Sequence, residues 1–259
     1  MANTKGNVYP FWGIANDFSV FAVDTDGILH PKSPPGFAFN IGIAEDGTVW
    51  ALSNLADPDG GGAEIFWTDG SDQWNEITSS APGGIRLTGG KDANCLYICA
   101  DRVLRTMGTD GVAQVMYYDK PIHDVDYGGG KLWAILPAVV GETLTLHRAE
   151  YAAEPHFDRF STSIHHPKGL SVNHAGDCYG IDERTAHYYA WDGRTGTAGA
   201  GAHGKTINIS FKNHNYILTT HANVSGNEVY EWRAIDGGRY VDAGFRAQKI
   251  LATYHRAED

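Results

Sequence analysis

The sequence lacks a disulfide framework, a basic cluster and a long apolar run, and each absence excludes a class of protein. Its three cysteines, Cys95, Cys99 and Cys178, are too few to staple a chain of 259 residues, so we expect free, buried thiols. The net charge of −11, with no run of Lys or Arg, argues against a nucleic-acid partner. No apolar stretch approaches the roughly 20 residues of a transmembrane helix, so no membrane insertion is expected.

The N-terminus also lacks the layout of a signal peptide. Residues 1–7 are polar and do not show a charged segment followed by an apolar one. We therefore expect a protein that is cytoplasmic as synthesised. Secretion by an unconventional route, or as a processed form, stays open.

Helical patterns are scarce as well. The best candidate, residues 149–154, is short and ends at Pro155, which favours a loop. The chain has instead 32 glycines and 12% aromatic residues, a composition typical of many short strands joined by tight turns. We therefore predict an all-β protein of a single domain, residues 1–259, large enough to fold without disulfides or metals.

A unit of four short strands recurs along the chain, and its clearest copy spans residues 39–77. Apolar runs at 39–45, 48–53, 64–67 and 73–77 are separated by turns, and two of these turns carry an Asp-Gly pair. Alternating or continuous apolar runs between such turns are typical of strands and hairpins. The unit therefore predicts a four-stranded antiparallel sheet.

The second strand of the unit marks the register of the repeat. Its six copies lie at residues 20–24, 49–53, 96–100, 132–136, 178–182 and 216–220. Four of the five intervals between their starts lie near the ~40–45 residues of a propeller blade. We predict a six-bladed β-propeller. The main structural alternative, an immunoglobulin-type sandwich, does not predict six copies of one marker.

The first of these intervals is short by about one strand, and the C-terminus can supply the missing strand. The N-terminal blade would hold residues 8–16, 18–24 and 28–31, while the apolar run 248–255 has no other partner. We predict that this C-terminal strand joins the N-terminal blade. Closing the ring in this way removes an open sheet edge, which otherwise invites aggregation.

The clearest unit resembles a tectonin repeat. Residues 41–52, 64–70 and 74–77 match the three segments of that repeat, and residues 131–134, 189–193 and 229–232 each match one of them. The resemblance covers the whole chain as architecture and about one blade in detail. It implies a carbohydrate-binding protein, a lectin without catalytic activity, with glycans or glycoconjugates as partners.

Tryptophans are the most visible candidates for a sugar site. For Trp50 and Trp133, inside the second strand, we expect packing between blades. At a turn near a sheet end, an indole can instead stack on a sugar ring while a carboxylate accepts its hydroxyls. The predicted ligand-binding residues are Trp67, Asp69, Trp74, Trp191, Asp192, Trp232 and Asp236. The alternative is that Asp and Gly at these positions only serve the turns.

An enzyme is the alternative function. A small propeller lyase or hydrolase would place its site in the central channel, on or beside the first strands of the blades. His123, Asp124 and Arg86 lie there in the predicted fold and are the candidate catalytic residues, while Asp126 and Asn208 share the position. Contacts with channel water also explain such polar groups.

A protein–protein interaction platform is a further alternative. No cofactor and no metal are expected. His165 and His166 are adjacent in sequence, so in a strand they point to opposite faces and cannot ligate one ion.

Overall fold

The structure, a computed structural model, contains strands and turns throughout the part of the chain that it describes. It describes residues 9, 11–24, 26–56, 62–78, 82–137, 144–160, 169–173, 175–181, 185–200, 204–209, 215–223, 226–233, 239–247 and 249–252. Among these residues, no helix is long and apolar enough to cross a membrane.

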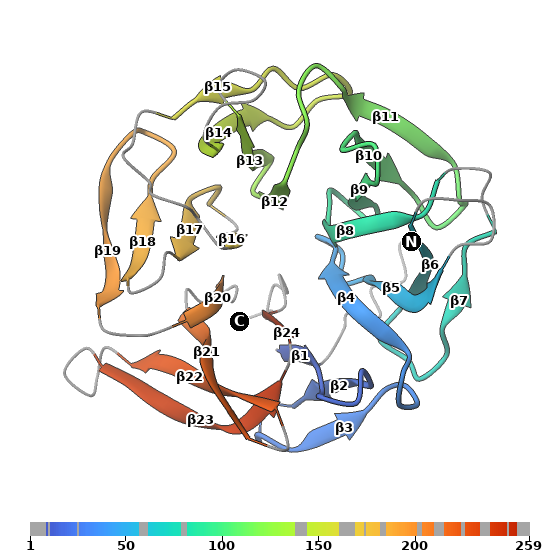
Figure 1. The fold of residues 1–259 in the computed structure, drawn as a ribbon, viewed down its shortest axis with the longest axis vertical. Helices are drawn as coiled ribbons and strands as arrows, with labels where there is room; N and C mark the ends of the chain where they lie inside the picture. Colours follow the sequence, from blue (N-terminus) through green and yellow to red (C-terminus); the bar gives the residue numbers. More distant parts are fainter. Residues whose placement is uncertain are drawn as a thin grey trace, which may run out of the picture.

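The strands form antiparallel sheets arranged around a common centre (Figure 1). The N-terminal sheet has the order β24 (Lys249–Ala252), β1 (Phe11–Ile14), β2 (Val20–Val23) and β3 (Leu29–Pro31). Two further meanders form one eight-stranded sheet, because the single pair of Ala63 and Gly84 joins them. The first meander holds β4 (Ala38–Ile43), β5 (Val49–Ala56), β6 (Ala63–Thr68) and β7 (Asn75–Glu76), and the second holds β8 (Gly84–Gly89), β9 (Cys95–Cys99), β10 (Leu104–Met107) and β11 (Ala113–Tyr117).

The last three sheets each contain four consecutive strands. One holds β12 (Asp124–Gly128), β13 (Lys131–Pro137), β14 (Leu144–Glu150) and β15 (Asp158–Arg159). The next holds β16 (Gly169–Val172), β17 (Cys178–Ile181), β18 (Thr185–Tyr189) and β19 (Thr195–Ala200). The last holds β20 (Gly204–Ile209), β21 (Asn215–Asn223), β22 (Gly226–Arg233) and β23 (Arg239–Ala247).

The C-terminal strand pairs with the N-terminal sheet, as the sequence predicts. Strands β24 and β1 are antiparallel, with Phe11 opposite Ala252 and Ile14 opposite Lys249. One detail of the prediction is wrong: residues 20–23 form the third strand of their sheet, and β1 is the second. The short first interval arose because a third strand was counted among second strands. Both kinds of strand are short and apolar, so their patterns look alike.

Strands near the core are apolar without interruption because sheets cover both of their faces. All four residues at 49–52 and all five of β9 are buried. Trp12, Trp50 and Trp133 are 0% exposed and belong to three different apolar clusters, those of Trp12 and Trp133 between neighbouring sheets and that of Trp50 between the two meanders of the eight-stranded sheet. The predicted packing role of Trp50 and Trp133 is thereby confirmed. Gly47 and Gly70 have φ of 94° and allow the two Asp-Gly turns of the clearest unit.

The innermost strands of the sheets lie side by side around the centre. In order they are β24, β4, β8, β12, β16 and β20, and β20 in turn contacts β24 (Figure 1). Side chains from several different sheets therefore come close together at this centre.

Candidate functional site

Two of the predicted sugar-binding tryptophans, Trp67 and Trp74, are half-buried and packed against apolar clusters. Trp67 lies opposite Trp50 in the β5–β6 ladder. The Trp74 indole contacts Phe37, with ring centroids 4.9 Å apart, and its Nε1 donates to the carbonyl oxygen of Lys32 at 2.8 Å. Asp69 is exposed and accepts from the backbone N–H of its own turn. These contacts fit a packing and turn-forming role.

Trp191 is also half-buried, and its ring is surrounded by other groups of the protein. It meets Trp133 edge-on at 5.9 Å, while Lys131 Nζ and Arg148 Cζ lie 4.5 Å and 5.1 Å from its centroid. Such cation–π contacts occupy the indole that a sugar would use. The adjacent Asp192 forms an exposed ion pair with Arg194, at 2.8 Å.

The last two predicted ligand-binding residues are Trp232 and Asp236, and neither side chain lies in the described part of the protein. Trp232 belongs to β22, but its side chain lies outside the described part of the protein, and Asp236 lies outside it altogether. Their role in binding stays a prediction.

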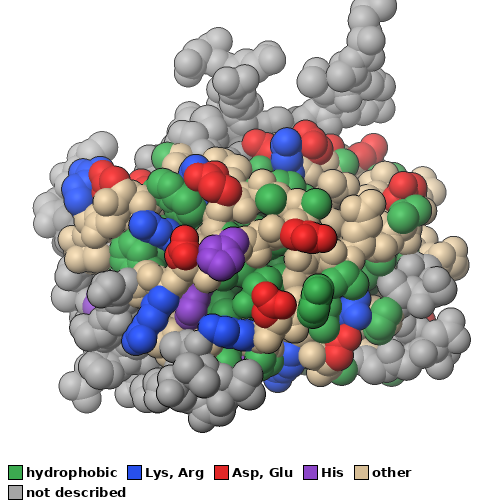
Figure 2. Space-filling model, turned by 90° about the horizontal axis from the view of Figure 1, so that it is seen from above, with side chains coloured by type: hydrophobic (Ala, Val, Ile, Leu, Met, Phe, Trp, Pro, Cys, Tyr) green, Lys and Arg blue, Asp and Glu red, His purple; other side chains and the backbone are tan. Residues whose placement is uncertain are grey.

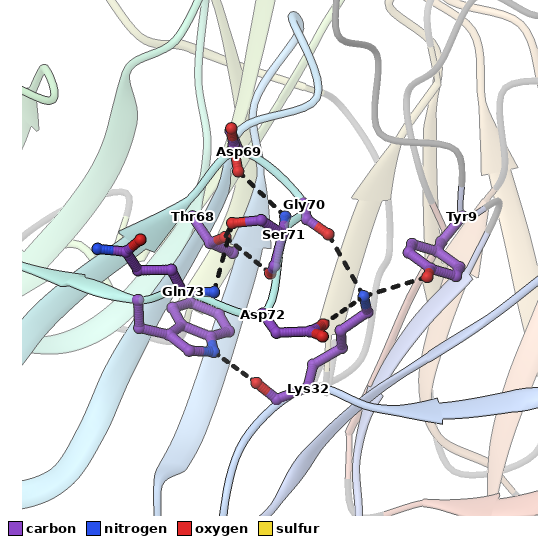
Figure 3. A network of polar contacts seen from close by, with 9 residues as sticks. Tyr9, Lys32, Thr68, Asp69, Gly70, Ser71, Asp72 and Gln73 are labelled. Atoms are coloured by element: carbon purple, nitrogen blue, oxygen red, sulfur yellow. Dashed lines mark hydrogen bonds and ion pairs between the residues drawn. The ribbon is translucent and has the colours of Figure 1, made fainter.

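A buried lysine joins the N-terminal sheet to the next meander. Figure 3 shows Lys32 Nζ donating to Tyr9 Oη at 3.1 Å, to Asp72 Oδ1 at 2.8 Å and to the carbonyl oxygen of Gly70 at 3.4 Å. An ammonium group has three N–H donors, so these acceptors use all of them. The side chain is 6% exposed, and the network therefore acts as a structural clamp.

The three candidate catalytic residues lie on or directly before the innermost strands β8 and β12, in the first half of each strand. Arg86 pairs with Ile98, and Asp124 pairs with Ile135. Ile98 and Ala134 occupy equivalent positions in β9 and β13, so Arg86, opposite Ile98, is level with Val125, opposite Ala134. Arg86 therefore lies one residue from the level of Asp124. His123 immediately precedes β12, and its backbone N–H donates to the Ile135 carbonyl at 2.9 Å.

The three side chains differ in exposure and charge. Arg86 is exposed, while His123 and Asp124 are half-buried. Partial burial lowers the pKa of His123, and the positive charge of Arg102 lowers it further. His123 is therefore neutral near pH 7, and a neutral imidazole can accept a proton.

Asp126, two residues further along β12, bridges three innermost strands. Its Oδ1 accepts from the Thr88 hydroxyl of β8, and its Oδ2 accepts from the Val172 N–H of β16 at 2.8 Å. Burial of the carboxylate raises the pKa of Asp126 to about 6, an effect that these hydrogen bonds reduce and that nearby Asp124 increases. The sequence placed Asp126 at the centre but gave no sign of Thr88 as its partner, because the two are 38 residues apart.

Other buried titratable groups are uncharged near pH 7. The three cysteines are free and buried, as expected, and burial raises the pKa of each; for Cys99 it reaches about 11. His147 is 2% exposed, and burial lowers its pKa to about 4. No group of three or more His, Cys, Asp or Glu among the described residues is arranged to hold a metal ion.

The rim that carries β11, β14 and β15 shows acidic, basic and histidine side chains interspersed with apolar ones (Figure 2). His156 and Asp158 form an ion pair of 3.5 Å there, with side chains 92% and 77% exposed. Exposed pairs of this kind contribute little. This view shows side chains of both charges mixed with apolar ones and no concentration of one charge.

Comparison with known proteins defines the fold class. No protein-family model and no curated protein matches the sequence. Solved structures of β-propellers do match, so the protein has a β-propeller fold. The chain is similar to virginiamycin B lyase from Staphylococcus aureus, with a TM-score of 0.57 at 13% identity over 95% of this chain and 87% of that one. It is similar to a gluconolactonase from Xanthomonas campestris, with a TM-score of 0.57 at 11% identity over 82% of this chain and 85% of that one.

A third similar structure is the WD40 propeller domain of Doa1, with a TM-score of 0.51 at 9% identity over 80% of this chain and 84% of that one. Identities this low support a shared fold only, because one fold hosts many functions. Among these structures none carries tectonin repeats by name.

Proposed function

We propose that the protein is a small β-propeller enzyme, a lyase or hydrolase, with its site at the central channel where β8 and β12 begin. The observation that carries this proposal is that a neutral imidazole, a carboxylate and a guanidinium lie within two residues of the same level on two adjacent innermost strands. In this assignment His123 takes the proton, Asp124 orients the substrate and Arg86 stabilises the negative charge that develops.

Two of the similar structures support this proposal over glycan binding. Their names describe a lyase acting on virginiamycin B and a gluconolactonase. We therefore propose a cyclic or polyhydroxylated substrate. Glycan binding at the turn tryptophans is the less favoured proposal, because the described indoles pack against protein groups. A protein-interaction platform has support only from the WD40 likeness.

The test is an assay for opening of a gluconolactone and for cleavage of virginiamycin B, followed by proton release and by mass spectrometry. The His123→Ala variant is expected to lose about 100-fold or more of the rate, since general acid–base catalysis contributes 10²–10⁴-fold. His156→Ala, at a fully solvated histidine, is the control and should keep the rate. A His123→Ala protein that folds and retains full activity, or a wild type inert on both substrates, overturns the proposal.

We also propose that the propeller has six blades and that β24 closes the ring. The two meanders of the eight-stranded sheet would count as two blades, since only one residue pair links them. Support for closure comes from the pairing of β24 with β1 and from its contacts with both β20 and β4.

A further inference from the structure

A small pocket lies at the opposite end of the strands from the proposed catalytic site. Asp124 begins β12, whereas this pocket follows the end of β8, between the β8–β9 turn and the β10–β11 turn. Its volume is about 330 Å³, at the lower end of the range for small-molecule sites. It is lined by Ala93, Asn94, Thr106, Met107, Gly108, Thr109, Asp110, Val112 and Gln114.

Hydrogen bonds hold the walls of the pocket in place. The Trp50 indole donates to the Ala93 carbonyl at 3.0 Å and ties the first turn to the neighbouring meander. The backbone N–H of Gly90 donates to the Asn94 carbonyl at 2.8 Å and closes that turn. In the second turn, the Val112 N–H donates to Asp110 Oδ1 at 3.0 Å. Pre-formed walls reduce the entropy that a ligand must lose on binding.

Several polar groups of this pocket remain available. Within the described chain, no hydrogen bond engages the side chains of Asn94, Thr109 or Gln114, and Asp110 keeps one carboxylate oxygen free. Asn94 Oδ1 and Asp110 Oδ1 both approach the backbone of Gly108, since a Cβ there would lie only 3.0 Å from the first and 3.2 Å from the second. Val112 is exposed and adds an apolar surface, whereas Met107 is buried beneath the pocket.

We propose that this pocket binds a small neutral polyol of monosaccharide size. Vicinal hydroxyls both donate and accept, so they match one carboxylate, two carboxamides and a hydroxyl. The C–H groups of a polyol match the exposed Val112 side chain. A cationic ligand would meet only one carboxylate, and an anion would meet no basic side chain in the lining. This binding is independent of the proposed catalytic function.

The test is titration of the full-length protein with a panel of monosaccharides and myo-inositol, followed by calorimetry or by NMR shifts. The expected result is saturable binding with a Kd of about 1 mM or below by at least one of them. Asn94→Ala and Gly108→Ala should each weaken this binding by about tenfold or more. Gly108 does not have a positive φ, so its backbone conformation accepts alanine, while the added Cβ would press on Asn94 Oδ1 and Asp110 Oδ1 and displace them.

Matched variants separate the pocket from general effects on turns. Asp17 and Asp110 each accept the backbone N–H of the residue two positions further on, so Asp17→Ala should leave binding unchanged while Asp110→Ala removes it. Absence of saturable binding by wild type up to about 50 mM, or equal binding by wild type and Gly108→Ala, overturns the proposal.

Discussion

Asp126 connects the innermost strands β8, β12 and β16. Because its carboxylate is buried between them, the stability of the fold depends on whether Asp126 is protonated. The pKa of Asp126 rises from 3.8 to about 6 on folding, so the folded protein binds a proton that the unfolded chain has released. Its contribution to the free energy of unfolding therefore falls as the pH rises from about 4 to about 6. Over this pH range the contribution of Asp126 to the free energy of unfolding falls by about 3 kcal/mol.

Asp126→Asn is expected to remove this pH dependence and to leave the fold intact, since an amide can still meet Thr88 and Val172. The measurement is urea unfolding of both proteins between pH 4 and pH 7. His147 has the opposite effect: its pKa is lowered to about 4, so its contribution is lost as the pH falls from 6.5. Because His147 is present in both proteins, the difference between them isolates Asp126, and parallel pH profiles would contradict its assignment.

At the scale of one element, β24 is the strand on which the N-terminal sheet depends. Deletion of residues 248–259 should lower the melting temperature markedly, since β1 loses its partner and β4 and β20 lose a neighbour. The control is deletion of residues 253–259, which keeps every residue of the β1–β24 ladder and should cost much less. Equal melting temperatures of the longer deletion and wild type would rule out this role for β24.

An element could be predicted from the sequence where a pattern of neighbouring residues causes it, and not where contacts between distant segments do. The Asp-Gly turns, the buried second strands and the apolar run at the C-terminus carry their own patterns, and each lies where the sequence placed it. The position of residues 20–23 within their sheet was not predictable, because second and third strands are both short and buried. The Thr88–Asp126 contact and the Asn94–Asp110 pocket arise from packing between separate loops or strands, which no local pattern encodes.

At the scale of the whole molecule, apolar clusters link the first four sheets in turn, as far as their side chains are described. Trp12, Trp50 and Trp133 lie in three different clusters, so tryptophan fluorescence reports on several of these junctions. We expect tryptophan fluorescence and far-UV circular dichroism of the wild type to give the same midpoint of unfolding in urea. Midpoints that differ by more than the error of the fit would mean that the sheets unfold separately.

The register between β1 and β24 also determines how the molecule responds to force. Phe11, the first residue of β1, lies opposite Ala252, the last residue of β24, so these two residues form the pair at one end of the ladder. Tension applied between Phe11 and Ala252 therefore loads the pairs one at a time, beginning at that end. We expect such a pull to separate β1 from β24 at a lower force than a pull that loads all the pairs at once.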